Sequence, residues 1–253
     1  QTDGVLTKAR IRSIDVEQFR AALADGAVPV VAGFQGVDKQ GNINTLGRGG
    51  SDTTGVAVAA ALKADVCEIY TDVEGMYTTD PNMCKEAKKL ERITFEEMLE
   101  LASLGAKVLQ LRSVEIAMKY GIPIHVRSSF SDATGTMVGA EDDSLEAVVV
   151  TGVACDKNDV KVTMRELPDK PGIVARVFTT LAEQNISVDM IIQTESRGER
   201  ADLTFTVTQT DLLRTRDVVT KVAKEIGSGP VEVHENVAKI SIVGAGMRSH
   251  AGV

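Results

Sequence analysis

The stretch from Thr45 to Thr54 constrains the fold of this chain more than any other part of the sequence. It reads Thr-Leu-Gly-Arg-Gly-Gly-Ser-Asp-Thr-Thr, and an Ala-rich run from Gly55 to Lys63 follows it. Glycines let a ligand approach the backbone closely, and either Ser51 or Asp52 can act as N-cap of a helix in the Ala-rich run. A helix N-terminus favours an anion, and the Arg48 guanidinium suits a carboxylate or phosphate. The pattern therefore indicates an anion-binding loop, with a tight surface loop as the alternative.

The segments on either side of this loop predict a strand–helix–strand unit. Residues 28–34 are continuously apolar, which is typical of a strand buried on both faces, and residues 64–72 form a second strand that ends in polar residues. Ligands of open α/β sheets bind beyond the carboxyl ends of strands. The loops 47–52 and 71–80 both fall at such ends, so we expect them to share one site. Asp72 on its own fits a ligand contact and a turn-capping carboxylate equally well.

The rest of the first half continues the α/β pattern. Thr94 to Glu97 is a capping box that opens a helix ending near Leu104, and a second helix is predicted from Lys107 to Gly121. A lysine in the first turn opposes the helix dipole, which a bound phosphate would offset, although a solvated lysine explains it as well. Residues 122–128 read as a strand, and the polar residues 132–144 as a linker.

The second half has the order of strands and helices of a small ferredoxin-like domain. Two helices and four strands are predicted in the order βαββαβ. The expected elements are a strand at 159–165, a helix at 173–183, strands at 186–191 and 203–207, a helix from 211 to 226, and a strand at 231–237.

Composition limits the class of protein. The chain has 253 residues, enough for two domains, and its net charge of −8 without a basic run argues against nucleic acid and anionic membrane as partners. No apolar stretch is long enough to span a bilayer. Three cysteines without a C-x-x-C pair indicate reduced thiols and a cytoplasmic location, and three scattered histidines argue against a metal site.

Four ordered motifs give a more specific resemblance. They are Val31-Ala32-Gly33-Phe34, Thr45 to Asp52, Tyr70-Thr71-Asp72-Val73-Glu74-Gly75-Met76-Tyr77-Thr78-Thr79-Asp80-Pro81, and Leu104-Gly105-Ala106-Lys107-Val108-Leu109. These motifs closely resemble those of aspartate kinases, which belong to the amino acid kinase family. The resemblance implies an α/β fold with an amino acid kinase-like, parallel-rich sheet and flanking helices. It also implies ATP- and Mg²⁺-dependent phosphorylation of the L-aspartate β-carboxylate to 4-phospho-L-aspartate, the first step of lysine, threonine and methionine biosynthesis.

The same resemblance implies a role for individual residues. Arg48 and Asp52 are implied as catalytic residues, Arg48 on a substrate carboxylate and Asp52 as the organising acid. The implied aspartate-binding residues are Phe34, Arg48, Gly49, Gly50 and Ser51. The implied ATP-binding residues are Thr71, Asp72, Tyr77, Lys107 and Val108. No protein ligand set for a metal is implied.

The chain also departs from the family pattern. Asn82 stands where many relatives carry an arginine near the nucleotide phosphates, so that contact is in doubt. The Lys-Phe-Gly-Gly-type strand-loop that supplies a catalytic lysine is not found in the sequence, and roughly one small domain's length of the family pattern is missing. We therefore expect the 253-residue chain to be inactive alone.

The second half resembles ACT domains, small modules that bind amino-acid effectors. The resemblance rests on the turn Pro168 to Gly172 and on the stretch Asn185 to Met190. It implies effector contacts at Asp169, Gly172, Val174, Ser187, Val188, Asp189 and Gln193, with lysine or threonine, or both, as effector. Without the resemblance, Asp169 would be a turn residue and Asp189 a solvated strand-edge charge.

These implications give a domain plan. We expect the carboxyl-terminal part of a kinase domain at 1–144, a first ACT domain at 159–234, and a second ACT domain split into 145–158 and 235–253. A homodimer or higher oligomer through the ACT domains is expected. The alternative function is that of a non-catalytic regulatory fragment or subunit that only binds effectors.

Overall fold

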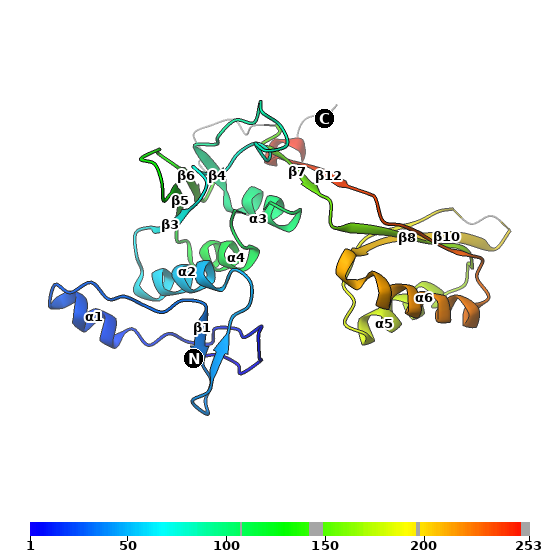
Figure 1. Cartoon of the computed structure of the whole chain (residues 1–253), viewed down its shortest axis with the longest axis horizontal. Helices are drawn as coiled ribbons and strands as arrows, with labels where there is room; N and C mark the ends of the chain where they lie inside the picture. Colours follow the sequence, from blue (N-terminus) through cyan, green and yellow to red (C-terminus); the bar gives the residue numbers. More distant parts are fainter. Residues whose placement is uncertain (107, 142–148, 196–197, 249–253) are drawn as a thin grey trace. The chain divides into compact units, whose positions relative to one another are not determined.

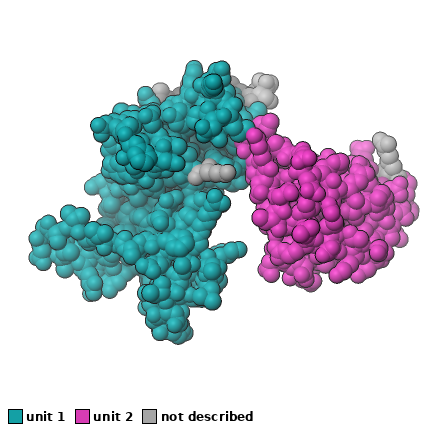
Figure 2. Space-filling view, in the orientation of Figure 1, with its two compact units in different colours: residues 1–154, 241–253 teal, residues 155–240 magenta. Residues whose placement is uncertain are grey.

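The computed structural model describes residues 1–106, 108–141, 149–195 and 198–248. The chain divides into two compact units (Figure 2). Unit 1 contains residues 1–154 and 241–253, and unit 2 contains residues 155–240. The strands β7 (Gly152–Asp156) and β12 (Lys239–Val243) pair with each other and include the two points at which the chain passes between the units. The finer domain plan given above stays a prediction.

Unit 1 is built on a four-stranded sheet with helices packed against it. The strand order is β3 (Cys67–Thr71), β5 (Ile124–Ser128), β6 (Thr136–Gly139) and β4 (Arg92–Thr94). The β3–β5 and β4–β6 pairs are parallel and the β5–β6 pair is antiparallel, which confirms the predicted parallel-rich α/β sheet. Strand β6 lies inside the segment predicted as a linker, so that prediction was wrong.

Three helices supply the rest of the core of unit 1. Helices α2 (Gly50–Leu62) and α4 (Leu111–Tyr120) lie side by side, and α3 (Phe95–Ser103) packs against α4 (Figure 1). Fully buried side chains from the helices meet fully buried side chains from the sheet. Examples are Val56, Met98 and Val114 from the helices, and Ile124 and Val138 from β5 and β6.

Helix α3 begins where the capping box predicts. The Thr94 hydroxyl accepts from the Glu97 N–H at 3.1 Å, and a Glu97 carboxylate oxygen accepts from the Thr94 N–H at 3.1 Å. The two other helix starts differ from the prediction. Helix α4 begins at Leu111 instead of Lys107, and Lys107 lies outside the described residues. Helix α2 begins at Gly50, before both residues predicted as its N-cap, Ser51 and Asp52.

The predicted N-cap of α2 was also wrong. Gly49 is the N-cap, with φ of +69°, and no side chain accepts a capping hydrogen bond there. Ser51 and Asp52 therefore lie inside the first helical turn. The physical reason is that a left-handed glycine ends the preceding loop without a side-chain acceptor, so the helix can start several residues earlier than the polar residues suggest.

The segment before α2 does not form the predicted buried strand. Helix α1 (Glu17–Ala24) is followed by irregular backbone, and Val28 and Val30 are 86% and 95% exposed. Strand β3 is the edge strand of the described sheet, and residues 28–34 make no ladder with it. Apolar composition alone does not make a strand where no neighbour satisfies its backbone groups. The antiparallel strands β1 (Gln35–Val37) and β2 (Ile43–Thr45) form a hairpin around the polar turn from Asp38 to Asn42.

Unit 2 has the predicted βαββαβ order. Its elements are β8 (Asp159–Pro168), α5 (Ile173–Glu183), β9 (Val188–Gln193), β10 (Arg200–Thr208), α6 (Leu212–Ile226) and β11 (Val231–His234). The sheet order is β11-β8-β10-β9, and every pairing is antiparallel. Both helices pack on one face of this sheet, where Leu181 and Val219 join Met164 and Phe205 in the core.

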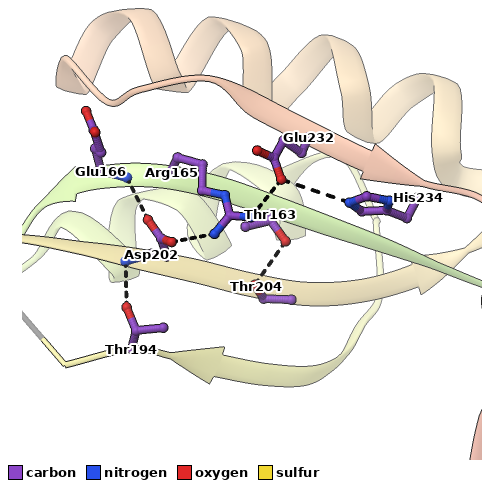
Figure 3. A network of polar contacts seen from close by, with 8 residues as sticks. All are labelled: Thr163, Arg165, Glu166, Thr194, Asp202, Thr204, Glu232 and His234. Carbon is purple, nitrogen blue, oxygen red and sulfur yellow. Dashed lines mark hydrogen bonds and ion pairs between the residues drawn. The ribbon is translucent and has the colours of Figure 1, made fainter.

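The opposite face of the unit 2 sheet carries a network of polar contacts on β8, β10 and β11 (Figure 3). The Arg165 guanidinium donates to Asp202 at 2.6 Å and to Glu232 at 2.8 Å, so that one side chain links strands β8, β10 and β11. The hydroxyls of Thr163 and Thr204 are 3.0 Å apart. Exposed ion pairs of this kind contribute little stability each.

Candidate active site

Phe34 is held against the N-terminus of α2 by its backbone and by its ring. Its φ of +69° is unusual for a bulky residue. Its N–H donates to the Thr54 hydroxyl at 3.2 Å, and its carbonyl accepts from the Leu46 N–H at 2.9 Å. A Cβ on Gly50 would lie 2.9 Å from a ring carbon of Phe34, so only glycine fits there.

The first turn of α2 offers groups that can bind an anion. The Thr53 hydroxyl donates to the Gly49 carbonyl at 2.9 Å, which fixes the turn. The N–H of Ser51 has no acceptor among the described residues, and Ser51 is exposed. Arg48 is also exposed and makes no hydrogen bond or ion pair with any described residue. The structure thus brings the predicted aspartate-binding residues together, with a guanidinium and a helix N–H both available to a ligand.

Asp52 lies in the same turn and is half-buried. Burial raises the pKa of its carboxyl group, and a hydrogen bond from the Gln110 N–H opposes that rise. Gln110 also fills the space beside Gly49, where a Cβ would lie 1.7 Å from the Gln110 Cγ. Gln110, the residue before α4, therefore packs against the loop at Gly49 and favours the charged form of Asp52. Burial, and then the charge of Asp52, raises the pKa of the buried Cys67 thiol, which keeps that thiol protonated.

The predicted nucleotide-binding residues form a second group at the carboxyl end of β3. The Thr71 carbonyl accepts from the Ser129 N–H at 2.8 Å, and the Thr71 hydroxyl donates to Asp72 at 3.1 Å. Asp72 is exposed, and Tyr77 is half-buried beside Lys89 in an isolated β-bridge. Val108 packs against the core of unit 1. Lys107, predicted beside it, lies outside the described residues.

The two groups are not joined by a polar contact within the described parts of unit 1. No hydrogen bond or ion pair between described residues joins the first turn of α2 to Thr71, Asp72 or Tyr77. Two cavities of about 570 Å³ and 260 Å³ are present, and none of the predicted site residues lines either of them. Arg48, Ser51 and Asp72 are exposed on the surface of unit 1.

Most of the predicted effector contacts fall at two opposite ends of the unit 2 sheet. Asp169 follows β8, and Gly172 caps α5 with φ of +91°. Val188 lies at the other end, where β9 begins beside Val207, and Asp189 follows it. Strand β8 has 10 residues, which corresponds to about 30 Å at roughly 3.3 Å per residue. Asp169 and Asp189 of a single unit 2 therefore cannot bind the same ammonium group.

Two of the remaining effector predictions follow the same division. Val174, in the first turn of α5, lies at the Asp169 end and is half-buried. Ser187, just before β9, is exposed at the Asp189 end. Gln193 ends β9 and pairs with Leu203, which pairs with Met164 on its other side, so Gln193 lies level with the middle of β8, between the two ends.

Asp189 already has a cationic partner. The Lys239 ammonium contacts the Asp189 carboxylate and lies 3.2 Å from the carboxylate of the buried Asp159. Burial lowers the pKa of Lys239, but the two carboxylates more than offset that effect and raise it overall. Sequence reasoning missed Lys239, which is 50 residues from Asp189.

Sequence reasoning also missed Gln110 and Arg112. The Arg112 guanidinium donates to the Leu46 carbonyl at 2.8 Å and to the Ala9 carbonyl at 3.0 Å. One signal was available for Arg112, because a cation in the first turn of a helix opposes the dipole and calls for a compensating partner. No comparable signal marks Gln110, since its N–H and its packing depend on the tertiary structure.

Comparisons with known proteins agree with this architecture. The model of the amino acid kinase family matches residues 2–128, and that of the ACT domain matches residues 162–227. The chain is 52% identical over its whole length to an aspartate kinase of Pseudomonas putida, of which it covers 62%. It is 48% identical to an aspartokinase of Mycolicibacterium smegmatis, of which it covers 61%. The chain thus spans about three fifths of the length of these curated relatives.

Solved structures give the same result. Escherichia coli aspartokinase III in complex with aspartate and ADP matches all of this chain with a TM-score of 0.77 at 32% identity, and the match covers 57% of that protein. The same enzyme in complex with lysine and aspartate matches 96% of this chain with a TM-score of 0.74 at 31% identity, over 55% of its own length. The described residues contain no helix that is long and apolar enough to cross a membrane. The family match, the mixed sheet and the loop before α2 together show that this chain belongs to the amino acid kinase family and carries an ACT domain.

Proposed function

We propose that this chain is part of an aspartate kinase that transfers the γ-phosphoryl group of ATP to the β-carboxylate of L-aspartate. The observation that carries the proposal is that two groups at the N-terminus of α2, the exposed Arg48 guanidinium and the Ser51 N–H three residues later, have no partner among the described residues. Both groups suit a carboxylate, and Phe34 closes one side of the turn. The relative from Escherichia coli that matches the whole chain was solved with aspartate and ADP.

The proposed chemistry needs no general base from the protein. A substrate carboxylate with an ordinary pKa of about 4 is ionised at neutral pH and can attack directly. Phosphoryl transfer then depends on positioning and on neutralising charge. Arg48 would hold a carboxylate of aspartate, and Thr71, Asp72 and Tyr77 would contact the nucleotide.

Mg²⁺ would accompany the nucleotide. Protein sites for this ion usually contribute one or two carboxylates beside the substrate phosphates, and the described residues contain no cluster of three metal-ligating side chains. The half-buried Asp52 and the exposed Asp72 offer carboxylates of this kind. When bound, the ion would neutralise charge on the phosphates.

We further propose that unit 2 binds lysine or threonine as a feedback effector. The N–H groups of Val174 and Ala175, in the first turn of α5, have no acceptor among the described residues, so they can receive an effector carboxylate. Asp169 is exposed beside them and can receive its ammonium group. Assembly through the ACT domains and a cytoplasmic location stay predictions.

The decisive experiment is a hydroxamate assay with the full-length protein that contains this chain, using L-aspartate, ATP and Mg²⁺. We expect aspartyl-phosphate to form and lysine or threonine to inhibit its formation. Omission of aspartate, and its replacement by glutamate, are the controls. Effector binding by calorimetry without any aspartyl-phosphate would favour the regulatory-subunit alternative instead.

A further inference from the structure

Arg112 connects α4 to the backbone just before the anion-binding loop. Its side chain is half-buried, and its two terminal nitrogens donate to the carbonyls of Leu46 and Ala9 at 2.8 and 3.0 Å. Both acceptor residues are buried, at 1% and 0% exposure. Two neutral carbonyls of separate chain segments are thus satisfied by one guanidinium.

The acceptor peptides belong to a tightly connected layer. The Ala9 N–H donates to the Thr45 carbonyl at 3.1 Å, which joins the first segment to β2. The Leu46 N–H donates to the Phe34 carbonyl at 2.9 Å. Leu46 is therefore fixed on its N–H side by Phe34 and on its C=O side by Arg112, and Arg48 follows two residues later.

The position of Arg112 in α4 supports a specific role. It is the second residue of the helix, where a positive charge opposes the helix dipole. A hydrophobic residue at this position would avoid the unfavourable interaction with the helix dipole. The guanidinium is suited to this place because its planar fork can reach two carbonyls at once, which the point charge of a lysine cannot do equally well.

We propose that Arg112 is a positioning residue for substrate, which sets the place of Phe34 and Arg48 by holding the Leu46 peptide between them. The inference rests on the proposed aspartate kinase activity. Arg112 does not itself bind substrate, because its two terminal nitrogens are directed to backbone carbonyls. Loss of its side chain leaves two buried carbonyls unpaired, and the loop moves to resolvate them. Among the described residues, no hydrogen bond joins this layer to Thr71 or Asp72 at the end of β3.

The test measures KM separately for the two substrates in the full-length protein containing this chain. For Arg112→Met we expect KM for aspartate to rise roughly tenfold or more, with KM for ATP within about twofold of wild type. Arg112→Lys should show an intermediate KM for aspartate, because one ammonium can restore one of the two hydrogen bonds. The Lys variant keeps the charge and provides the measurement if the Met variant does not fold.

The matched control is Arg127→Met, which removes an arginine of the same unit that pairs with Glu68 on the surface of the sheet. It should leave KM for aspartate unchanged. Wild-type KM for aspartate in both Arg112 variants would overturn the inference, as would an equal rise of both KM values. A lower melting temperature with both KM values unchanged would show a structural role only, and would also overturn it. Absence of aspartyl-phosphate formation by the wild type would instead refute the proposed function, and this inference with it.

Discussion

The carboxylate of Glu97 ties the start of α3 to both segments at which the chain enters and leaves unit 2. One oxygen accepts from the Thr94 N–H and hydroxyl, at 3.1 and 3.0 Å. The other oxygen accepts from the Thr151 hydroxyl and, at 3.4 Å, from the Ala245 N–H. Thr151 precedes β7, and Ala245 follows β12. We predict that Glu97→Gln loosens these two segments and the start of α3 together.

The expected magnitude follows from these contacts. Loss of a capping interaction costs about 1 kcal/mol, and loss of a hydrogen bond to a charged group about 1.5–3 kcal/mol. Both carboxylate oxygens of Glu97 accept hydrogen bonds, so the NH₂ group of a glutamine would place a donor opposite either the Thr94 donors or the Thr151 and Ala245 donors. Since Glu97 is only 9% exposed, water cannot replace the missing contacts, and we expect a local loss of about 2–4 kcal/mol.

The pH dependence gives a second signature. Burial, the largest single influence, raises the pKa of Glu97, but the hydrogen bonds from Thr151, Thr94 and Ala245 together lower it below the ordinary 4.5. A lowered pKa means that the folded state binds fewer protons than the unfolded state. The stabilisation is therefore fully present above the ordinary pKa and is lost as the pH falls through the folded-state value. Wild type and variant should converge in acid.

The assay is amide hydrogen exchange, because a chain with two units need not unfold in one step. The Thr94 and Ala245 amides should exchange about 30-fold faster or more in Glu97→Gln near neutral pH. Glu96→Gln is the control, since it makes the same change on the exposed neighbouring residue. Exchange of both amides at wild-type rates in Glu97→Gln would refute the reasoning.

Three further predictions concern the proposed activity of the full-length protein. Arg48→Lys should lower kcat/KM for aspartate by a factor that corresponds to about 1.5–3 kcal/mol of lost binding free energy. An unchanged kcat/KM for aspartate in steady-state kinetics would remove Arg48 from the substrate site. Asp52→Asn should abolish activity yet keep or raise the melting temperature. Burial raises the pKa of this carboxyl group, so its charged form lowers the stability of the folded state once the pH rises above about 3.8. A variant less stable than wild type at neutral pH would contradict this. Asp169→Ala should relieve inhibition by lysine or threonine with uninhibited kcat nearly intact, and an unchanged inhibition curve would make Asp169 a turn residue only.

Much of the fold was predictable because it depends on local patterns. The capping box at Thr94 and Glu97 specifies the start of α3 through contacts within four residues, and the structure confirms it. The pattern of apolar and polar residues in unit 2 predicted its order of strands and helices, because each of those elements buries one face. The sequence marks Thr45 to Thr54 as a candidate anion-binding loop for the same reason, since its glycines and arginine act through their immediate neighbours.

The failed predictions depend on contacts that are distant in sequence. Residues 28–34 have the composition of a buried strand, yet a strand requires a partner, and none of the described strands pairs with them. The start of α2 is set by Gly49, whose missing Cβ leaves room for the side chain of Gln110, 61 residues later (110 − 49). No local pattern contains that information. A local signal marks Arg112, as a cation in the first turn of α4, but its acceptors lie 66 and 103 residues away and cannot be identified from it.

The proposed effector site shows how a distant contact can change a functional interpretation. A carboxylate at a strand edge, such as Asp189, looks available to an ammonium group when only its neighbours in the sequence are considered. In the structure Lys239 neutralises it, and Lys239 is itself only 11% exposed in its side chain. An effector ammonium would have to displace this internal one, whereas the exposed Asp169 has no cation bound among the described residues. The loop before α5 is therefore the better place for an amino-acid effector within unit 2.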